Sequence, residues 1–272
     1  MSDFLDTMAR QSATRAAAFR DSFTGASYSM PVQPLRLQGF DLVAEIKDRS
    51  PAEGELVNAT ISRAERARRY AEAGAAAISV LTEPTRFDGS MEHLREVVAA
   101  VADTGVPVMR KDFLVDESQL LEAREAGASG ALLIAAMLPG ERLQDMLDEA
   151  EAHGLFVLLE CFDATDVARV TELLADERNR LRADTGDLLL GINTRNLRTL
   201  AVDTGRLAGL APMLPAGITC VAESGLHTPD DAAAVRGMGY GMALVGTALM
   251  RAADPAALLR AMLAAGRAQV AS

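Results

Sequence analysis

Short apolar runs alternate with amphipathic segments from about residue 42 to near the end of the chain. Most runs follow a glycine or an Ala-Gly-Ala turn, and several are rich in valine and isoleucine. The runs are LVAEIK, AAISVLTE, VPVMRKDF, GALLIAA, LFVLLECF, DLLLGINTR, ITCVAESG and MALVGT. Near-continuous apolar runs of this kind are typical of parallel strands that are buried on both faces. We therefore predict eight parallel strands.

The segments between these runs have the pattern of amphipathic helices. Residues 61–74 place Ala and Tyr on one face and Arg and Glu on the other, and they end at a glycine. Segments 116–128, 140–154 and 228–239 repeat the polar start and the glycine near the end. In the last of them Thr228 is the predicted N-cap and Pro229 the first helical residue.

Eight strands that alternate with helices predict an α/β fold, a (β/α)8 TIM barrel. An open doubly wound sheet is the alternative, but such a sheet usually carries a glycine-rich fingerprint after its first strand. Here the first strand is followed by DRSPAEGEL, which is no such fingerprint.

The residues before the first strand form an extension. FLDTMARQSATRAAAFRDSF has helical spacing, whereas MPVQPLRL is predicted to be an extended connector because Pro31 and Pro34 disfavour a helix. We expect the helix to cap the barrel. The chain is predicted to be a single domain over 1–272, with an N-terminal helical extension at 1–40, the barrel at 41–250 and a C-terminal helix at 251–272.

The composition and net charge indicate which kinds of molecule the protein can bind. The chain has 272 residues, a length typical of an α/β barrel, and a formal net charge of −11. An acidic protein is a poor partner for nucleic acid or an anionic membrane, because both attract cationic surfaces. A small anionic substrate remains possible, since a few local cations can dominate a pocket.

The sequence predicts neither export nor membrane insertion. The first residues, MSDFLDTMARQ, include acidic side chains and no long apolar run, unlike a secretory signal. No apolar stretch approaches the ~20 residues of a membrane span. Cys161 and Cys220 lie inside apolar runs and are predicted to be buried, reduced thiols. We therefore predict a cytoplasmic protein.

Polar side chains stand at the C-terminal ends of seven of the eight predicted strands, where barrels of this class build their active sites. Only GALLIAA ends without one. The polar or small residues at the strand ends are Glu45, Lys47, Thr82, Glu83, Lys111, Asp112, Glu160, Asn193, Arg195, Glu223, Ser224, Gly246 and Thr247. Charge crowded at the mouth of a packed barrel is costly unless it is paired or used. We therefore predict that these ends form one site.

The residue types suggest the chemistry of that site. Lys47, Lys111 and Arg195 supply cations for a substrate with more than one negative charge. Glu45, Glu160 and Glu223 can hold the lysines or move protons. AESGL and LVGTALM bring glycine amides and a hydroxyl together, as in many barrel phosphate sites. Because Lys111 is expected near two other cations, we predict that its pKa is lowered.

These motifs, in this order, resemble those of the indole-3-glycerol phosphate synthase family of tryptophan biosynthesis. AEIKDRSP resembles the family's first-strand signature, and ISVLTEPTRFDGS its second strand and the following loop. VMRKDF, LLLGINTRNL, AESGL and LVGTALM match the third, sixth, seventh and eighth strands. The resemblance covers about residues 40–250 and also fits the N-terminal extension, since the family carries a helical segment over the barrel mouth.

The resemblance implies a carbon–carbon lyase that needs no metal or organic cofactor. Such an enzyme closes the indole ring of 1-(2-carboxyphenylamino)-1-deoxyribulose 5-phosphate and releases carbon dioxide and water. Lys111 would be the general acid that protonates the ribulose carbonyl, and Glu160 the acid/base partner in the later loss of hydroxide. Lys47, held by Glu45, would contact the substrate's anionic groups and assist dehydration, and Asn193 would orient the substrate.

The resemblance also implies the substrate-binding residues. Ser50 and Arg195 would contact the substrate, with Ser50 near the anthranilate carboxylate, and Glu223 and Ser224 would complete the polar wall. Gly225, Gly246 and Thr247 would hold the phosphate. Phe87, Phe113, Leu133 and Leu197 would line an apolar slot for the aromatic ring. No metal is expected, and the three histidines, His93, His153 and His227, are not at metal-ligand spacing.

Some positions depart from the family pattern. Asp48 follows Lys47 where a cationic or neutral residue is more usual, and Glu53 stands where a lysine is usual. A carboxylate at position 53 would repel the substrate unless its loop points it outward. Phe162 takes the place of a histidine two residues after the predicted acid/base Glu160, and a phenylalanine cannot form that residue's hydrogen bonds.

Other functions remain open at this stage. One is a paralogue that acts on a modified anthranilate-derived substrate in specialised metabolism. Another is a phosphate-binding isomerase barrel, which would want an Asp or Cys pair at the first and seventh strands that AEIK and AESG do not supply. A third is a catalytically silent barrel that binds a sugar phosphate or a partner protein. The expected partner is a small sugar-phosphate substrate, and the expected assembly is a monomer or weak homodimer.

Overall fold

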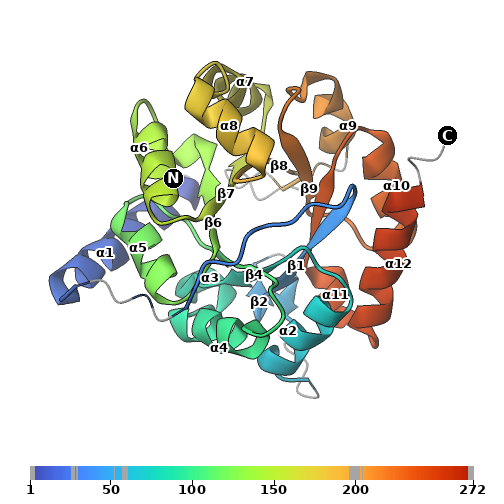
Figure 1. Ribbon diagram of the computed structural model, residues 1–272, viewed down its shortest axis with the longest axis horizontal. Helices are drawn as coiled ribbons and strands as arrows, with labels where there is room; N and C mark the ends of the chain where they lie inside the picture. Colours follow the sequence, from blue (N-terminus) through green and yellow to red (C-terminus); the bar gives the residue numbers. More distant parts are fainter. Residues whose placement is uncertain are drawn as a thin grey trace.

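Eight parallel strands form a closed barrel in the computed structural model, as predicted (Figure 1). The structure describes residues 4–25, 28, 30–51, 53–56, 61–195, 203 and 205–268. The barrel strands are β1 (Asp41–Ile46), β4 (Ala77–Leu81), β5 (Val108–Lys111), β6 (Gly130–Ile134), β7 (Phe156–Cys161), β8 (Leu188–Asn193), β9 (Thr219–Glu223) and β10 (Met242–Val245). Each strand pairs with its neighbours in sequence, and β1 closes the barrel against β10.

A ring of helices surrounds the barrel (Figure 1). The longer helices are α2 (Arg63–Glu72), α4 (Met91–Val101), α5 (Ser118–Glu125), α6 (Arg142–Ala152), α7 (Ala164–Leu173), α8 (Glu177–Thr185), α10 (Pro229–Gly237) and α12 (Pro255–Ala268). Shorter helical turns are α3 (Pro84–Phe87), Ala135–Met137, α9 (Arg206–Leu210), Ala211–Met213 and α11 (Thr247–Arg251). The four amphipathic segments predicted from the sequence are α2, α5, α6 and α10.

The start of α10 shows how local sequence determines these boundaries. Thr228 has extended backbone angles, and its side chain accepts a hydrogen bond from the amide of Asp231. The Asp231 carboxylate in turn accepts from the Thr228 amide, which completes a capping box, and Pro229 is the first helical residue. The predicted cap is confirmed, and it pairs backbone groups that a helix leaves unsatisfied.

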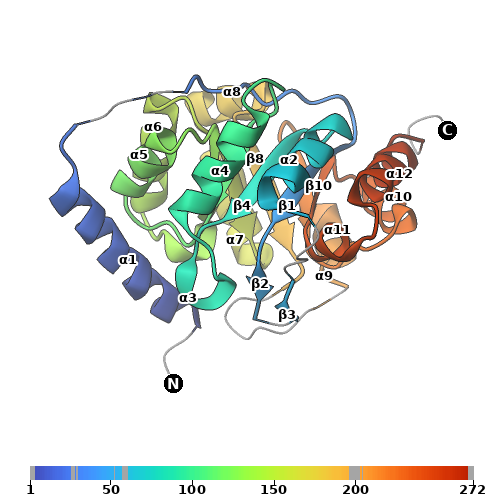
Figure 2. The same cartoon turned by 90° about the horizontal axis from the view of Figure 1, so that it is seen from below.

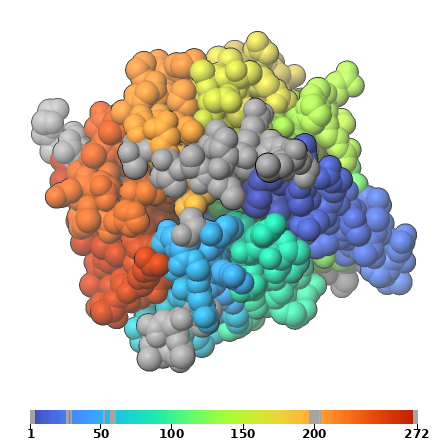
Figure 3. Space-filling view, turned by 180° about the vertical axis from the view of Figure 1, so that it is seen from behind, coloured from blue at the N-terminus to red at the C-terminus, as the bar shows by residue number. Residues whose placement is uncertain are grey.

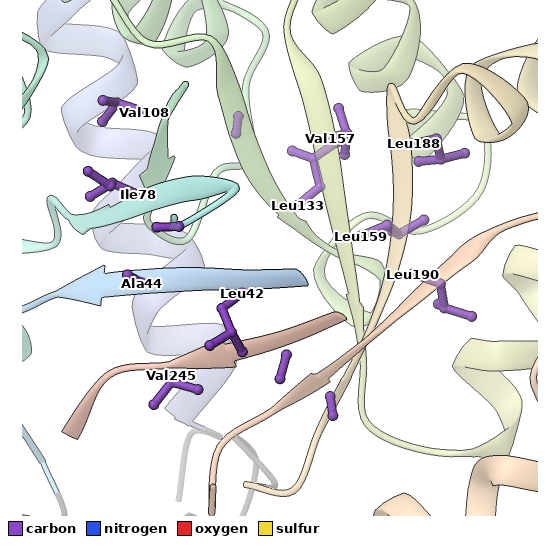
Figure 4. Close-up of a cluster of buried hydrophobic side chains, with 14 of the residues drawn as sticks. Leu42, Ala44, Ile78, Val108, Leu133, Val157, Leu159, Leu188, Leu190 and Val245 are labelled. Carbon is purple, nitrogen blue, oxygen red and sulfur yellow. The ribbon is translucent and has the colours of Figure 1, made fainter. Parts of the chain in front are cut away.

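The barrel strands divide their side chains between two apolar cores. In β1, Leu42 and Ala44 point outward into the larger core between barrel and helices, part of which Figure 4 shows. Val43, between them, belongs to a second core inside the barrel. Since side chains alternate along a strand, an inward residue near the base predicts inward residues at every second position up to the mouth. This alternation selects which strand-end residues reach the site.

The N-terminal extension is helical, as predicted. Helix α1 (Phe4–Ser22) lies beside α5 (Figure 2). Leu5 and Met8 contribute to the core inside the barrel, and Ser12 accepts a hydrogen bond of 2.9 Å from the Gln119 side chain. Residues 31–38 carry no regular secondary structure. The first turns of α1 therefore cover one side of the barrel mouth.

A small hairpin after β1 was not predicted. β2 (Arg49–Ser50) and β3 (Gly54–Glu55) pair antiparallel within the DRSPAEGEL segment. In Figure 2 the hairpin lies beyond the end of β1, at the same end of the barrel as α3. It places residues of this segment over the mouth.

Cys161 and Cys220 are both buried free thiols, as predicted. Within the described ranges, no helix has the length and apolar character that crossing a membrane requires.

Gly266 of α12 lies against the buried ring of Phe40, and a Cβ added there would stand 2.0 Å from Cδ1. We expect Gly266→Ala to lower the free energy of unfolding by about 1–3 kcal/mol, because a ring buried on all sides cannot move freely. Gly237→Ala, at the end of α10 with nothing within 4 Å, is the matched control. It should leave stability unchanged or raise it by up to about 1 kcal/mol. Equal effects of the two substitutions in urea unfolding would contradict this packing.

Candidate active site

The C-terminal ends of the strands surround a cavity of about 190 Å³. On the face shown in Figure 3, the N-terminal helix, the segment around residue 50 and the C-terminal part of the chain meet around a central hollow. The cavity is lined by these predicted site residues: Glu45, Lys47, Ser50, Phe87, Lys111, Phe113, Glu160, Asn193, Arg195, Glu223, Ser224, Gly225, Gly246 and Thr247. The barrel therefore brings together residues that are up to about two hundred positions apart in the chain.

Lys111 lies at the centre of a cluster of buried charges. Its Nζ is 3.2 Å from Oε2 of Glu160 and 3.7 Å from Oε2 of Glu223. On the adjoining side, Lys47 Nζ is 2.6 Å from Oε1 of Glu45. Glu160 and Glu223 are fully buried, and 15% of the Lys111 side chain is exposed toward the cavity. Each lysine is thus paired, and Lys111 can still reach a molecule in the cavity.

The predicted direction of the Lys111 pKa shift is wrong. Burial of the ammonium acts to lower its pKa, but the carboxylates of Glu160, Glu223 and Glu45 outweigh burial and raise it well above the ordinary lysine value. The prediction counted only neighbouring cations, whereas the nearest charges in the fold are anions. Lys111 is therefore an ammonium at neutral pH, with its proton available to a strong base.

The carboxylates of the cluster differ in their surroundings. Burial and the neighbouring Glu160 raise the pKa of Glu223 well above its usual range, and the Lys111 ammonium offsets this only in part. Neither Glu223 oxygen has a hydrogen-bond donor among the described residues. Burial also acts to raise the pKa of Glu45, but Lys47 and then Lys111 lower it overall. The site thus holds Glu223, whose carboxyl group favours the protonated form, and Glu45, which favours the anion.

Two glycines make room for these charges. A Cβ added at Gly191 in β8 would stand 2.0 Å from Oε1 of Glu223, and one at Gly246 would stand 2.2 Å from Oε1 of Glu45. Gly246 was predicted only as a phosphate ligand, and Gly191 was not predicted at all. An isolated glycine inside an apolar run such as LLLGIN often marks the close approach of another group, so the sequence could have predicted a close contact at Gly191.

Arg110 and Asp112, on either side of Lys111, connect the strand end to the surrounding helices, and Asp112 also lines the cavity. Arg110 is buried on the outer face, where it donates to the Gln119 carbonyl at 2.8 Å and to the Glu122 carboxylate at 2.7 Å. Asp112 accepts from Arg15 of α1 at 2.7 Å and from Thr82 at 2.8 Å. Arg110 and Asp112 therefore fasten helices α5 and α1 to the end of the strand that carries Lys111.

Glu83 is likewise structural. Its carboxylate caps α3 by accepting from the amides of Thr85 and Arg86, at 2.8 and 2.7 Å. Neither Thr82 nor Glu83 is among the residues that line the cavity. The predicted ring of strand-end polar groups is therefore incomplete at β4, where Leu81 faces the cavity instead.

Three phenylalanines form an aromatic wall on one side of the cavity. The ring of Phe113 lies 5.9 Å from that of Phe4 in an edge-on arrangement and 6.2 Å from that of Phe87. Phe87 and Phe113 were predicted here. Phe4 was not, because it belongs to α1 and only the docking of that helix brings it to the cavity.

The placement of Leu133 was wrong by one residue. Leu133 belongs to the core between barrel and helices, and Figure 4 labels it among the side chains of that core, whereas Leu132 and Ile134 line the cavity. Side chains alternate between the two faces of a strand, so a one-residue error moves the side chain from the cavity to the outer face. Leu197, predicted to line the same slot, lies outside the described residues.

Glu53 points inward, contrary to the orientation that would spare an anionic substrate. Its Oε1 accepts a hydrogen bond of 3.1 Å from Thr247, and its Oε2 is 3.4 Å from Nη1 of Arg251.

Ser224 and Gly225 also line the cavity, and both have left-handed backbone angles, φ 69° and 77°. Left-handed backbone is uncommon outside glycine and often marks functional turns, so the bend at Ser224 supports a binding role for this turn.

The three histidines occupy separate places. His227 lines the cavity, His93 is 3.8 Å from Asp48, and His153 is hydrogen-bonded to Tyr28 and Glu149. In the part of the chain that the structure describes, no three His, Cys, Asp or Glu side chains are placed to hold a metal ion.

The lysines themselves carried a signal that sequence analysis did not use. The chain has 27 lysines and arginines, and only Lys47 and Lys111 are lysines. Both line the cavity. Arginine is always charged in proteins, whereas lysine can release a proton, so these two lysines are candidates for proton transfer at this site.

A closed (β/α)8 barrel with buried acids and lysines at its C-terminal mouth defines a barrel enzyme. Comparisons with known proteins narrow this class. The sequence profile of indole-3-glycerol phosphate synthase matches residues 26–262. The chain belongs to the indole-3-glycerol phosphate synthase family, whose members are carboxy-lyases.

Individual relatives agree with the profile. The indole-3-glycerol phosphate synthase of Nocardioides sp. (strain ATCC BAA-499 / JS614) is 44% identical over 262 residues, covering 95% of this chain and 94% of the relative. That of Parafrankia sp. (strain EAN1pec) is 43% identical over 233 residues, covering 85% and 81%. A tryptophan synthase alpha subunit from Legionella pneumophila matches in structure, with a TM-score of 0.54 and 17% identity, over 98% of this chain and 100% of that chain. It supports the fold alone.

The raised pKa of Glu223 predicts how stability depends on pH. A group whose pKa is higher in the folded than in the unfolded chain contributes stability that is fully present below its ordinary pKa of 4.5 and is lost as pH rises. Glu223→Gln removes this dependence. We therefore expect the difference in melting temperature, variant minus unaltered protein, to increase by at least about 2 °C as the pH is raised from about 5 to about 9.

The exposed Glu172 of α7 supplies a matched control, since Glu172→Gln should show no such trend. A constant difference in melting temperature across this pH range for Glu223→Gln would contradict the assigned environment.

Proposed function

We propose that this protein is an indole-3-glycerol phosphate synthase. It converts 1-(2-carboxyphenylamino)-1-deoxyribulose 5-phosphate into indole-3-glycerol phosphate, carbon dioxide and water. The observation that carries the proposal is the contact of Lys111 with Glu160 and Glu223 at the mouth of the barrel, in a chain of this family. Such a set can deliver a proton to the carbonyl oxygen of the substrate and later help that same oxygen to leave as water.

Ring closure is the step that needs Lys111. The aromatic carbon that bears the carboxylate attacks the ribulose carbonyl, and negative charge develops on the carbonyl oxygen. The Lys111 ammonium donates its proton to that oxygen as the carbon–carbon bond forms. Its raised pKa keeps the donor form fully populated at neutral pH. The developing alkoxide is basic enough to accept the proton, so a lysine with a high pKa can still act as the acid.

Loss of carbon dioxide restores the aromatic ring, and loss of water completes the indole. Glu160 lies 3.2 Å from Lys111 and serves as the acid/base partner when the hydroxyl departs. Glu223, whose pKa is raised, is a second proton source beside it. Lys47, held by Glu45 at 2.6 Å, faces the anionic groups of the substrate and assists dehydration. Asn193 orients the substrate, and its own Oδ1 is fixed by the amide of Arg195 at 2.9 Å.

The remaining substrate contacts are proposed for residues that line the cavity. The wall of Phe4, Phe87 and Phe113 accommodates the aromatic ring of the substrate. Ser50 and Arg195 contact the substrate, with Ser50 at its carboxylate. Glu223 and Ser224 form the polar wall, and Gly225, Gly246 and Thr247 hold the phosphate, because glycine amides and a hydroxyl are donors suited to that group.

The alternative of a modified substrate gains no support from Phe162. That side chain is buried in the core inside the barrel and is not among the residues that line the cavity. A silent barrel is disfavoured because both lysines and all three glutamates of the cluster are present and paired. We also propose that the protein acts in the cytoplasm as a monomer or weak homodimer, as one domain over residues 1–272.

Substitutions in the acid–base pair test the proposed roles. Lys111→Ala and Glu160→Gln should each lower turnover of the carboxyphenylamino-deoxyribulose phosphate at least ~10²-fold, because each removes a general acid or base. Growth of indole fluorescence measures the rate. Glu172→Gln, on the exposed face of α7, should keep the full rate. A folded Lys111 or Glu160 variant that retains most of the activity would count against the role of that residue.

Gly191→Ala tests the position of Glu223. The added methyl group would collide with Oε1 of Glu223 and displace that carboxyl group from Lys111. Turnover should fall at least about tenfold while KM changes little, since the methyl group perturbs the acid–base cluster. The fold should survive because the end of a glutamate side chain can move. Unchanged turnover in this variant would show that the exact place of Glu223 does not matter to the reaction.

A further inference from the structure

Glu53 occupies the donors that the proposed phosphate site needs. The Thr247 hydroxyl donates to Oε1 of Glu53 at 3.1 Å, and Nη1 of Arg251 is 3.4 Å from Oε2. Arg251 also donates through Nη2 to the backbone carbonyl of Glu53 at 3.4 Å. One hydroxyl and one guanidinium from α11 thus hold both oxygens of a carboxylate that comes from the hairpin after β1.

A carboxylate held in this way is a chemical stand-in for a phosphate. Both groups present adjacent anionic oxygens, and a hydroxyl together with the planar fork of an arginine suits either of them. Thr247 is also a proposed ligand of the substrate phosphate. Glu53 and that phosphate therefore compete for one donor, and their like charges prevent them from sharing the place.

We propose that Glu53 is an internal competitor of the substrate phosphate, and that Arg251 is a further phosphate-binding residue which passes from Glu53 to the phosphate when the substrate binds. This inference rests on the proposed function in so far as the substrate is a phosphate ester. In the free protein Glu53 neutralises Arg251 and keeps the anion site occupied. In the complex the Glu53 side chain turns away, and the phosphate binds Thr247 and Arg251 in its place.

The exposure of the pair allows this exchange. The side chains of Glu53 and Arg251 are 25% and 58% exposed. Ion pairs that face solvent contribute little to stability, so the pair opens at small cost. A phosphate dianion carries more charge than the carboxylate and forms stronger hydrogen bonds with the same donors. Competition therefore weakens phosphate binding without abolishing it, and it excludes anions that bind Arg251 and Thr247 less strongly than Glu53 does.

Binding of inorganic phosphate, measured by calorimetry on the full chain, tests both residues without requiring turnover. We expect Glu53→Gln to tighten phosphate binding at least about threefold, since a surface ion pair of this kind is worth up to a few-fold in affinity. Arg251→Gln should weaken binding at least about threefold, in the unaltered protein and in the Glu53→Gln background alike. The KM for the substrate should shift in the same directions.

Matched controls separate these effects from net charge. Glu55→Gln alters an exposed carboxylate on the same hairpin, and Arg260→Gln alters an exposed arginine on α12. Both should leave phosphate binding unchanged. Arg251→Lys, which keeps the charge but not the planar fork, should lose less affinity than Arg251→Gln.

The sign of the Arg251 effect is decisive. If Arg251 only anchors Glu53, its removal frees Thr247 and phosphate binds more tightly, which overturns the role proposed for Arg251. Unchanged or weaker phosphate binding in Glu53→Gln overturns the competition. Absence of turnover with the expected pattern of phosphate affinities would count against the proposed function while supporting this inference.

Discussion

The buried charges around Lys111 are the constraint on which the site depends. A carboxylate or an ammonium moved singly out of water costs several kcal/mol, and only close opposite charges offset that cost. Glu160 and Glu223 are fully buried, and each lies within 4 Å of the same ammonium, while Glu223, next to Glu160, favours its protonated form. The cluster is therefore stable only as a set. A closed barrel supplies it, because its strands end at one mouth and hold each side chain at a defined distance from its partner.

The free protein pairs its site cations with its own carboxylates. Lys111 faces Glu160 and Glu223, Lys47 faces Glu45, and Arg251 faces Glu53. The proposed substrate brings a carboxylate and a phosphate of its own. In the proposed complex the substrate phosphate replaces only Glu53, at the exposed pair with Arg251, and the buried pairs of Lys111 and Lys47 stay in place. Burial thus distinguishes the pairs that we propose to be catalytic from the pair that we propose to respond to the ligand.

Several features of the site followed from the strand pattern and others did not. Every second residue of a strand faces the same side, so Glu45, Lys111 and Glu160 could be placed at the mouth once the strands were recognised. The same rule exposed the error at Leu133, since the cavity receives Leu132 and Ile134. The pKa of Lys111 could not be predicted in the right direction, because its sign depends on which charges lie within a few ångströms after folding.

Local sequence was enough to predict the eight strands, the amphipathic helices, the cap at Thr228 and the set of polar residues at the strand ends. These depend on local periodicity and on backbone preferences that act over a few residues. Long-range packing, in contrast, brings Phe4 to the cavity, places Gly191 where it leaves room for Glu223, and lets Glu53 bind Thr247. Each of these contacts joins segments far apart in the chain. Their geometry is set by how the barrel closes and how α1 and the hairpin dock on it, which local sequence does not encode.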